Sequence, residues 1–350
     1  MITNSWLFKQ LHADLIGKDS YRGVTLTYAW MANQFGHFAL GFIPTIILFH
    51  FIKGKQIFKN EILSSASIIT GFWVLFETYN FLWPLLKHLL NGGDKGYVFK
   101  PAWGNVAFDT CTDLVFFAMG AFTATLFLEY QELNMFILVG LACTVVLPSV
   151  YWFKTKMYQN AARFPFQCRL SQWKSDITVE DKTKVLNFVN ATSRGNHLLI
   201  FGSKKSGKTS LSIAIANEMA IKHKACTYTT SMKLFSMFFE DIPDEGLPWD
   251  WKKAEYLIID DINPGGEIKD ELVQVNEFKK YMDAYGENNE NRTILREKNV
   301  IWVLGSYETE NRGQQWQQLL EDIGVPQNKI QTIDLECSSL DNVIVLREAY

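Results

Sequence analysis

Long apolar runs dominate residues 1–159 of the chain, whereas the rest alternates short apolar segments with polar ones. The runs extend from Tyr28 to Phe51, from Ile62 to Leu86, from Pro101 to Leu128 and from Leu133 to Phe153. A helix needs about 20 apolar residues to cross a bilayer. Each run is long enough and carries at most two charged side chains. The pattern therefore predicts four transmembrane helices.

The pattern changes after Lys156. We expect a helix over VEDKTKVLNFVNAT, with Thr178 as its cap and with Val179, Leu186 and Val189 on one face. Short apolar segments then alternate with helical ones: HLLIF, EYLII, NVIWVL, KIQTIDL and NVIVLREAY. Such alternation is typical of a mainly parallel sheet with helices on both faces.

The segment before the first apolar run does not resemble a signal peptide, because it carries Asp14 and Asp19 and lacks a compact apolar stretch. Five of its apolar side chains fall roughly on one helical face: Trp6, Leu7, Phe8, Leu11 and Leu15. This predicts an amphipathic helix that lies at the membrane interface or packs on the soluble domain, and the sequence leaves both possibilities open.

Charged residues make up 20% of the chain, which is below the roughly 25% of typical soluble proteins. The apolar half is charge-poor and slightly basic, and the remainder is acidic. This composition excludes a disordered chain, a collagen-like fibre and a small disulfide scaffold. The cysteines form no C-x-x-C pair, so we expect neither a zinc site nor disulfides.

Four spans place both termini on one side of a membrane. If that side is the cytoplasm, the basic residues inside are Lys9, Lys18, Arg22, Lys87, Lys95, Lys100, Lys154 and Lys156, against Lys53, Lys55 and Lys59 outside. Basic residues prefer the cytoplasmic side. We therefore predict a multi-pass protein of the inner (cytoplasmic) membrane with both termini in the cytoplasm.

Polar side chains interrupt the predicted spans: His37, Glu77, Asn80, Asp109 and Asp113. With a rise of about 1.5 Å per residue, His37, Glu77 and Asp109 lie at a similar depth. Such groups are costly in hydrocarbon and usually face the interior of a helix bundle. They either pair only to hold the bundle together or form an intramembrane site for an ion, a proton or a lipid headgroup.

One short pattern in the membrane half carries a family resemblance. FDTCTDLVFFAMGA, with the upstream Glu in ETYN, resembles the acidic signature of the VanZ-like and YjdF-like membrane families. The resemblance covers about Phe35 to Ala124 and implies no particular chemistry.

The strongest motif in the chain is GSKKSGKT, between a predicted buried strand and a helix. It fits the P-loop pattern G-x-x-x-x-G-K-[ST], in which backbone amides cradle phosphates, the lysine reaches the β- and γ-phosphates and the hydroxyl ligates Mg²⁺. We therefore expect ATP and Mg²⁺ as ligands, with Lys208 on the phosphates and Thr209 on the metal. The predicted nucleotide-binding residues are Gly202, Ser203, Lys204, Lys205, Ser206, Gly207, Lys208, Thr209 and Ser210.

A second apolar strand, from Tyr256 to Ile259, ends at Asp260 and Asp261. We predict that Asp260 holds Mg²⁺ through water and that Asp261 orients or activates the attacking water, although Asp261 could instead only cap the next turn. A third strand ends beside Ser306, whose hydroxyl could contact the γ-phosphate or the water. The predicted catalytic residues are thus Lys208, Asp261 and Ser306.

GKTSLSIAIANEMAIKHKACTYTTSMKLF and YLIIDD resemble the DnaC/IstB/DnaA branch of AAA+ ATPases, over about Asn187 to Leu335. The resemblance implies an AAA+-like P-loop fold and gives Ser306 the place of the polar sensor. Two features depart from the family: only 15 residues follow Leu335, too few for an α-helical lid, and no arginine finger is evident. Its candidates are Arg292, Arg296 and Arg312; Arg312 best fits a loop after the sensor strand, and a plain surface arginine is the alternative.

These patterns predict a four-helix transmembrane domain plus an α/β P-loop NTPase domain, with a mainly parallel sheet and helices on both faces. The expected divisions are an N-terminal cytoplasmic or interfacial segment (1–27), the four-span membrane domain (28–156), a linker and collar helix (157–190) and the cytoplasmic ATPase domain (191–350).

Three functions fit this organisation. The first is a membrane-anchored cytoplasmic ATPase that switches its membrane domain or a partner. The second is a transporter, channel or lipid-acting protein that the ATPase regulates. The third is an ATP-binding membrane adaptor without turnover. The expected partners are the lipid bilayer and either further copies of the chain or another protein. The soluble domain is acidic and has no basic stripe with interleaved aromatics, which argues against direct nucleic-acid binding.

Overall fold

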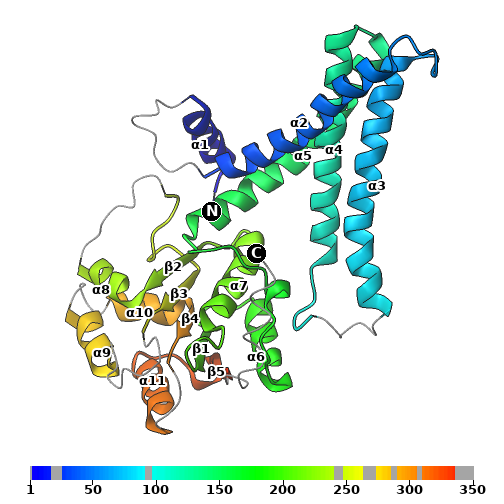
Figure 1. Cartoon of the computed structure of the whole chain (residues 1–350). Coiled ribbons are helices and arrows are strands. Elements are labelled where there is room, and N and C mark those ends of the chain that lie inside the picture. The colour runs from blue at the N-terminus through cyan, green and yellow to red at the C-terminus, as the bar shows by residue number, and fades with distance from the viewer. Residues whose placement is uncertain are drawn as a thin grey trace. The chain divides into compact units, whose positions relative to one another are not determined.

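The computed structural model of the chain describes residues 2–16, 26–90, 97–239, 247–262, 273–284, 290–305 and 310–335. The chain divides into two compact units. The helical unit comprises Ile2–Gly96 and Lys100–Met157, and the α/β unit contains Tyr97–Phe99 and Tyr158–Tyr350. Figure 1 labels their helices and strands.

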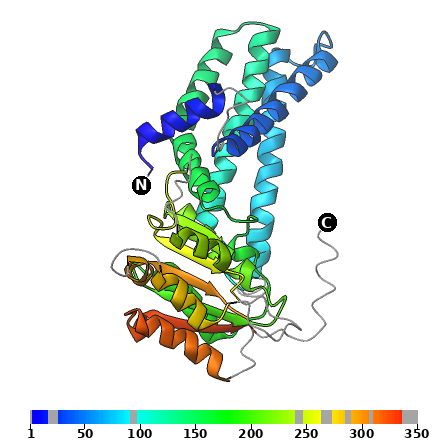
Figure 2. The ribbon, with the colours of Figure 1, turned by 90° about the vertical axis from the view of Figure 1, so that its left-hand side faces the viewer.

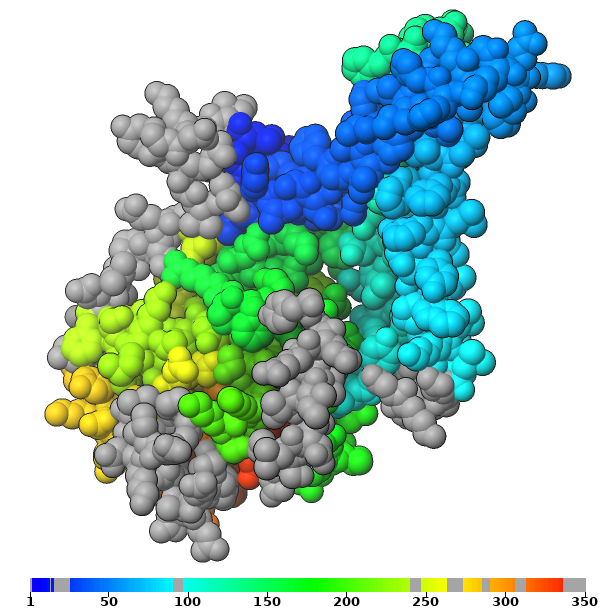
Figure 3. Space-filling model, viewed as in Figure 1, coloured from blue at the N-terminus to red at the C-terminus, as the bar shows by residue number. Residues whose placement is uncertain are grey.

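Long helices make up the described part of the helical unit: α1 (Asn4–Ile16), α2 (Tyr28–Ile52), α3 (Glu61–Leu90), α4 (Trp103–Leu128) and α5 (Glu132–Ala161), whose last turn belongs to the α/β unit. Among the described residues, α2, α3, α4 and α5 are long and apolar enough to cross a membrane, as predicted. Large apolar side chains lie on their surfaces: Leu75, Phe127 and Leu147 are 73%, 77% and 80% exposed. Figure 3 shows the side chains of α2 and α3, in blue and cyan, on the surface of this unit. A surface of this kind is suited to hydrocarbon, not water.

Helices α2 and α4 cross with their backbones in close approach. A Cβ atom on Gly41 would lie 2.0 Å from the carbonyl oxygen of Phe117, and one on Gly120 would lie 1.9 Å from the carbonyl oxygen of Phe38. No real side chain tolerates such distances. Small residues allow helices to approach this closely within a membrane, so the crossing depends on both glycines.

Helix α1 packs within the helical unit. Leu11 contacts the cluster of Trp30, Met31 and Trp152. The carboxylate of Asp14 accepts hydrogen bonds from the backbone N–H and the hydroxyl of Thr27, the residue that precedes α2. These contacts hold α1 against the start of α2.

Parallel strands form a five-stranded sheet in the described part of the α/β unit, in the order β2-β3-β4-β1-β5. The strands are β1 (His197–Gly202), β2 (Cys226–Thr230), β3 (Tyr256–Asp260), β4 (Asn299–Val303) and β5 (Ile330–Leu335). The parallel sheet confirms the sequence-based prediction, except that NVIVLREAY lies outside the described residues. Because all five strands run in one direction, the loops that follow β1 and β3 lie at the same edge of the sheet.

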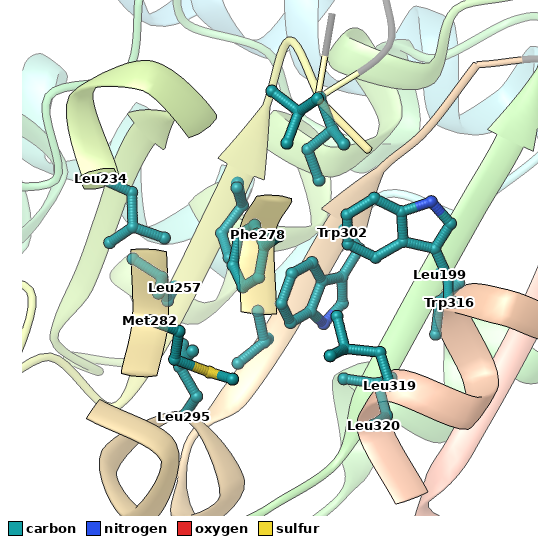
Figure 4. Packing of buried hydrophobic residues seen from close by; sticks show 14 of the residues in the cluster. Leu199, Leu234, Leu257, Phe278, Met282, Leu295, Trp302, Trp316, Leu319 and Leu320 are labelled. Carbon is teal, nitrogen blue, oxygen red and sulfur yellow. The ribbon is translucent and has the colours of Figure 1, made fainter. Parts of the chain in front are cut away.

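Helices cover both faces of the sheet, again as predicted (Figure 2). Leu199, Leu257 and Trp302 point to one face, where they pack with side chains from α8 (Ser231–Phe239), α9 (Val275–Ala284), α10 (Glu290–Glu297) and α11 (Glu310–Asp322) (Figure 4). The other face is covered by α7 (Lys208–Ile221), which contacts β1 to β4, and by α6 (Val179–Asn190), which contacts α7 and β5. The core of the unit therefore lies on the two sides of the sheet.

The predicted cap of α6 is confirmed, but of the three apolar residues predicted to share one face, Val189 is buried and Val179 and Leu186 are not. The hydroxyl of Thr178 accepts a hydrogen bond from the backbone N–H of Asp181 at 3.1 Å. Val179 is 82% exposed and Leu186 is 37% exposed. The buried side chains of the helix are Asp181, Val185, Phe188 and Val189.

Polar contacts explain the orientation of α6. The ammonium group of Lys184 donates to the carboxylate of Asp181 at 3.0 Å and to the carbonyl oxygen of Thr332 on β5 at 3.1 Å. This fixes the face that contains Asp181 against β5, and residues 185, 188 and 189 follow it at helical spacing. Val179 lies in the first turn and points away.

Candidate nucleotide-binding site

The GSKKSGKT segment forms a tight loop between the end of β1 and the start of α7. A Cβ atom on Gly202 would lie 2.5 Å from the carbonyl oxygen of Leu335 and 2.6 Å from the hydroxyl of Ser206. Gly207 has a φ of 89° and is the N-cap of α7. Both positions therefore require glycine. The loop leads into a helix N-terminus, whose free N–H groups and positive dipole end suit an anion.

Lys208 folds back over this loop. Its ammonium group donates hydrogen bonds to the carbonyl oxygens of Gly202 and Ser203, both at 2.7 Å. Burial lowers the pKa of Lys208, and the negative charges of Asp260 and Asp334 act in the opposite direction. A buried cation is thus held inside the loop, next to the helix N-terminus and within electrostatic reach of the β3 carboxylate.

The other loop residues divide into buried and exposed ones. Ser206 is buried and Ser203 is partly buried, and neither hydroxyl has a hydrogen-bond partner among the described residues. Lys204 and Lys205 are exposed at the tip of the loop. Two buried hydroxyl donors without an acceptor fit a ligand that supplies acceptor oxygens, as a phosphate chain does.

Thr209 and Ser210 lie in the first turn of α7, directly after Lys208, and both are partly buried. Thr209 thus follows the lysine on the element that faces the loop. The structure places all nine predicted nucleotide-binding residues in one continuous turn, from the end of β1 into α7.

Asp260 ends β3 and is almost completely buried. One of its carboxylate oxygens accepts a hydrogen bond from the hydroxyl of Tyr228 at 2.8 Å, and the other accepts from the backbone N–H of Asp261, also at 2.8 Å. Burial and the charge of Asp260 raise the pKa of Tyr228, so this hydroxyl keeps its proton and remains a donor. Tyr228 lies on β2, the neighbour of β3, and sequence reasoning did not single it out.

Asp261 follows in a left-handed conformation with a φ of 53°. Its side chain is exposed, and its backbone carbonyl accepts a hydrogen bond from the hydroxyl of Ser231 at 3.0 Å. Partial desolvation of its carboxyl group, and then the neighbouring charge of Asp260, raise the pKa of Asp261 above its ordinary value. Such a carboxylate is a stronger base than a free aspartate.

The remaining predicted site residues are not brought to the loop in the described part of the chain. Ser306 and the side chain of Arg312 lie outside the described residues. Arg292 forms an ion pair with Asp283, which raises the pKa of the guanidinium. Arg296 lies 3.5 Å from the carboxylate of Glu297. The assignment of an arginine finger stays a prediction.

The polar side chains of the predicted spans come together in part. His37 Nδ1 on α2 lies 3.0 Å from a carboxylate oxygen of Asp113 on α4. Gln34, one turn before His37, donates a hydrogen bond to the same oxygen at 3.1 Å. Sequence reasoning missed Gln34, although its spacing to His37 places both on one helix face.

The other members of this set lie around that pair. Glu77 on α3 accepts a hydrogen bond from the side chain of Asn80 and is within electrostatic reach of His37 and Asp113. Asp109 also interacts electrostatically with His37. Asn80 and Asp109 are exposed on the surface of the unit. Among the described residues, no group of three or more His, Cys, Asp or Glu side chains is placed to hold a metal ion.

Comparison with known proteins assigns the chain to no family. No protein-family model matches the sequence, and no curated protein matches it. A crystal structure of DnaI is similar at 18% sequence identity over 51% of this chain and 92% of that chain, with a TM-score of 0.33. The membrane-family resemblance is not supported by any match. The function proposed below therefore rests on the geometry of the site.

Proposed function

We propose that the chain is a membrane-anchored cytoplasmic ATPase that binds and hydrolyses Mg-ATP to switch the state of its membrane domain or of a partner. The observation that carries this proposal is the position of Lys208. Its ammonium group is held inside a glycine-dependent loop, at a helix N-terminus, within electrostatic reach of the buried Asp260. This is the arrangement that binding of a phosphate chain requires.

Each residue of the site then has a role. Lys208 and the amides at the start of α7 bind the phosphates, and the hydroxyls of Ser203 and Ser206 supply further donors. Thr209, and Asp260 through water, would hold Mg²⁺, which neutralises phosphate charge in such sites. Asp261, with its raised pKa, orients the attacking water or accepts its proton. Tyr228 positions the carboxylate of Asp260.

The excess of basic residues on one side of the predicted spans supports an inner-membrane location with both termini in the cytoplasm. In that orientation the loop meets cytosolic ATP. We infer that the chain works with further copies of itself or with a protein partner, because P-loop ATPases commonly couple turnover to such contacts.

Replacing the two aspartates separately tests the chemistry. Asp261→Asn should leave ATP binding unchanged and slow phosphate release by at least about a hundredfold, the usual contribution of a general base. Asp260→Asn should in addition change the Mg²⁺ dependence of binding. Phosphate release and labelled-ATP binding by the full-length protein give the measurement. If both variants hydrolyse ATP at the rate of the wild type, β3 is not the acidic strand of the site. If the wild-type protein binds ATP but does not hydrolyse it, the result favours the adaptor function.

Tyr228→Phe removes one hydrogen bond from Asp260 and leaves the ring in place. We expect the Mg²⁺ concentration for half-maximal turnover to rise about fivefold, which corresponds to one lost hydrogen bond, while ATP binding without Mg²⁺ stays the same. Tyr256→Phe is the matched control, because Tyr256 also bonds a side chain, that of Asn299, but lies at the opposite end of β3. Equal Mg²⁺ dependence in both variants would remove Tyr228 from the site.

The intramembrane set supports a second candidate function, that of a transporter, channel or lipid-acting protein regulated by the ATPase. The observation that favours it is the convergence of three helices, in which His37 lies 3.0 Å from Asp113 and both interact with Glu77. Stimulation of ATP turnover by a proton gradient, an ion gradient or a particular lipid would support this function over the first.

A further inference from the structure

A tryptophan outside the P-loop motif contacts the loop directly. Trp173 follows a short 3-10 turn, η2 (Leu170–Gln172), and only 3% of its surface is exposed. Its indole N–H donates a hydrogen bond to the carbonyl oxygen of Gly207 at 3.2 Å. A Cβ atom on Gly207 would lie 3.2 Å from this nitrogen and 3.0 Å from the hydroxyl of Ser175. The segment 173–175 therefore lies directly against the last glycine of the loop.

The carbonyl that Trp173 contacts sets the start of α7. The same oxygen of Gly207 accepts the hydrogen bond from the backbone N–H of Leu211 at 2.9 Å, the first bond of the helix. The direction of this carbonyl thus fixes the direction of the N–H groups that follow it. A change in the loop that rotates this carbonyl changes the contact with Trp173, because the oxygen accepts both hydrogen bonds.

The segment before Trp173 is attached farther along the same helix. The guanidinium of Arg169 donates to the carboxylate of Glu218 on α7 at 2.8 Å, and the backbone N–H of Leu170 donates to the same oxygen at 3.3 Å. The side chain of Asn217 donates to the carbonyl oxygen of Cys168 at 2.9 Å. These bonds hold residues 168–170 along α7. They fix the position of Trp173, which follows them and contacts the loop.

A residue from the connection between α3 and α4 completes this contact. Tyr97–Phe99 belongs to the α/β unit, although the chain on both sides of it belongs to the helical unit. Phe99 is 2% exposed, and its ring centroid lies 6.0 Å from that of Trp173, with the rings inclined by 54°. Aromatic pairs attract at this separation. Phe99 is four residues from the first residue of α4, so it is covalently close to a predicted membrane span.

We propose that Trp173 is a positioning residue of the P-loop and that Phe99 links it to the connection between α3 and α4, so that Mg-ATP binding is transmitted to that connection. The inference rests on the proposed nucleotide site and gives the route by which its state reaches the membrane helices. Coupling between two sites is reciprocal. If Mg-ATP favours one arrangement of the Phe99 contact, that arrangement must in turn favour Mg-ATP binding.

The first test measures labelled-ATP binding by the full-length protein in lipid nanodiscs. Trp173→Phe keeps the ring and removes the N–H, and it should weaken Mg-ATP binding about fivefold, the effect of one hydrogen bond. Trp249→Phe is the matched control, because this indole is also buried and donates to the carbonyl oxygen of Cys226 at 2.9 Å, away from the loop. This variant should leave affinity unchanged. Equal affinities in the two variants would overturn the role of Trp173.

The second test uses a readout that a purely structural role would not change. The thiol introduced by Val98→Cys is alkylated with and without Mg-ATP, and its rate is followed by mass spectrometry at that position alone. Mg-ATP should change the rate by about fivefold or more, the lower end of typical allosteric coupling. The change should disappear in the additional presence of Phe99→Leu. It should persist with Phe188→Leu, an equally buried phenylalanine on α6 whose ring contacts Tyr256 at the start of β3.

The outcomes are distinguishable from failure of the proposed function itself. If labelled ATP binds but the alkylation rate at position 98 is the same with and without Mg-ATP, this inference alone is overturned. Absence of any Lys208-dependent ATP binding would overturn the nucleotide site and the inference with it.

Discussion

Replacing Lys208 with alanine is expected to abolish Mg-ATP binding or to weaken it severely. Among the described residues, the ammonium group of Lys208 bonds the loop carbonyl oxygens of Gly202 and Ser203, and in the proposed site it would exchange them for phosphate oxygens. Removing one partner of a buried, hydrogen-bonded charge pair costs about 2–5 kcal/mol, so affinity should fall at least about thirtyfold. Equilibrium binding of labelled ATP to the full-length protein measures this.

Lys222→Ala provides the control for Lys208→Ala. Lys222 caps the other end of α7, where its ammonium group bonds the carbonyl oxygen of Val189 at 3.3 Å. The Lys222→Ala variant changes the net charge by the same amount as Lys208→Ala and should leave ATP affinity unchanged. Equal affinity of Lys208→Ala and wild type, in protein shown to be folded, would contradict the assignment of the loop.

Replacing Gly41 with valine is expected to destroy the packing of the helical unit. Its Cβ would lie 2.0 Å from the carbonyl oxygen of Phe117, and Gly120 faces the same conflict with Phe38. Because both obstacles are backbone atoms, α2 and α4 must separate along their crossing. We expect a loss of roughly 3 kcal/mol or more, the upper range for overpacked cores. Thermal unfolding of the detergent-solubilised protein, monitored by the loss of helical circular dichroism, gives the measurement.

Gly36→Val on the same helix is the matched control, because a Cβ at that position has no atom within 4 Å outside its own helix. It should shift the unfolding temperature only slightly. Equal unfolding temperatures for Gly36→Val and Gly41→Val would show that α2 and α4 do not cross at Gly41.

The sequence predicted those features that depend on short stretches of chain. Four long apolar runs are sufficient to identify α2 to α5, since few other structures accommodate them. The GSKKSGKT pattern likewise placed a glycine-dependent loop between a strand and a helix. Thr178 was recognisable as a cap because capping depends on a local hydrogen bond.

Features that depend on distant contacts were not predictable. Tyr228 meets Asp260 only because β2 and β3 are neighbours in the sheet, and the sequence does not give the strand order. Trp173 contacts Gly207 through a fold of the collar that has no motif. The burial of Val185 instead of Val179 depended on the pairing of Asp181 with Lys184, which a count of apolar positions does not include. Gly41 and Gly120 are two small residues among many, and only the packed helices distinguish them.

The most direct test of a membrane-anchored ATPase with its site in the cytoplasm compares sealed membrane vesicles of opposite orientation that contain the full-length protein. Phosphate release from added Mg-ATP is measured in inside-out and right-side-out vesicles, each with wild type and with Lys208→Ala. We predict turnover by the wild type in inside-out vesicles, none in right-side-out vesicles until detergent opens them, and none with Lys208→Ala in either. Turnover that is independent of Lys208, or that appears in sealed right-side-out vesicles, would contradict the account.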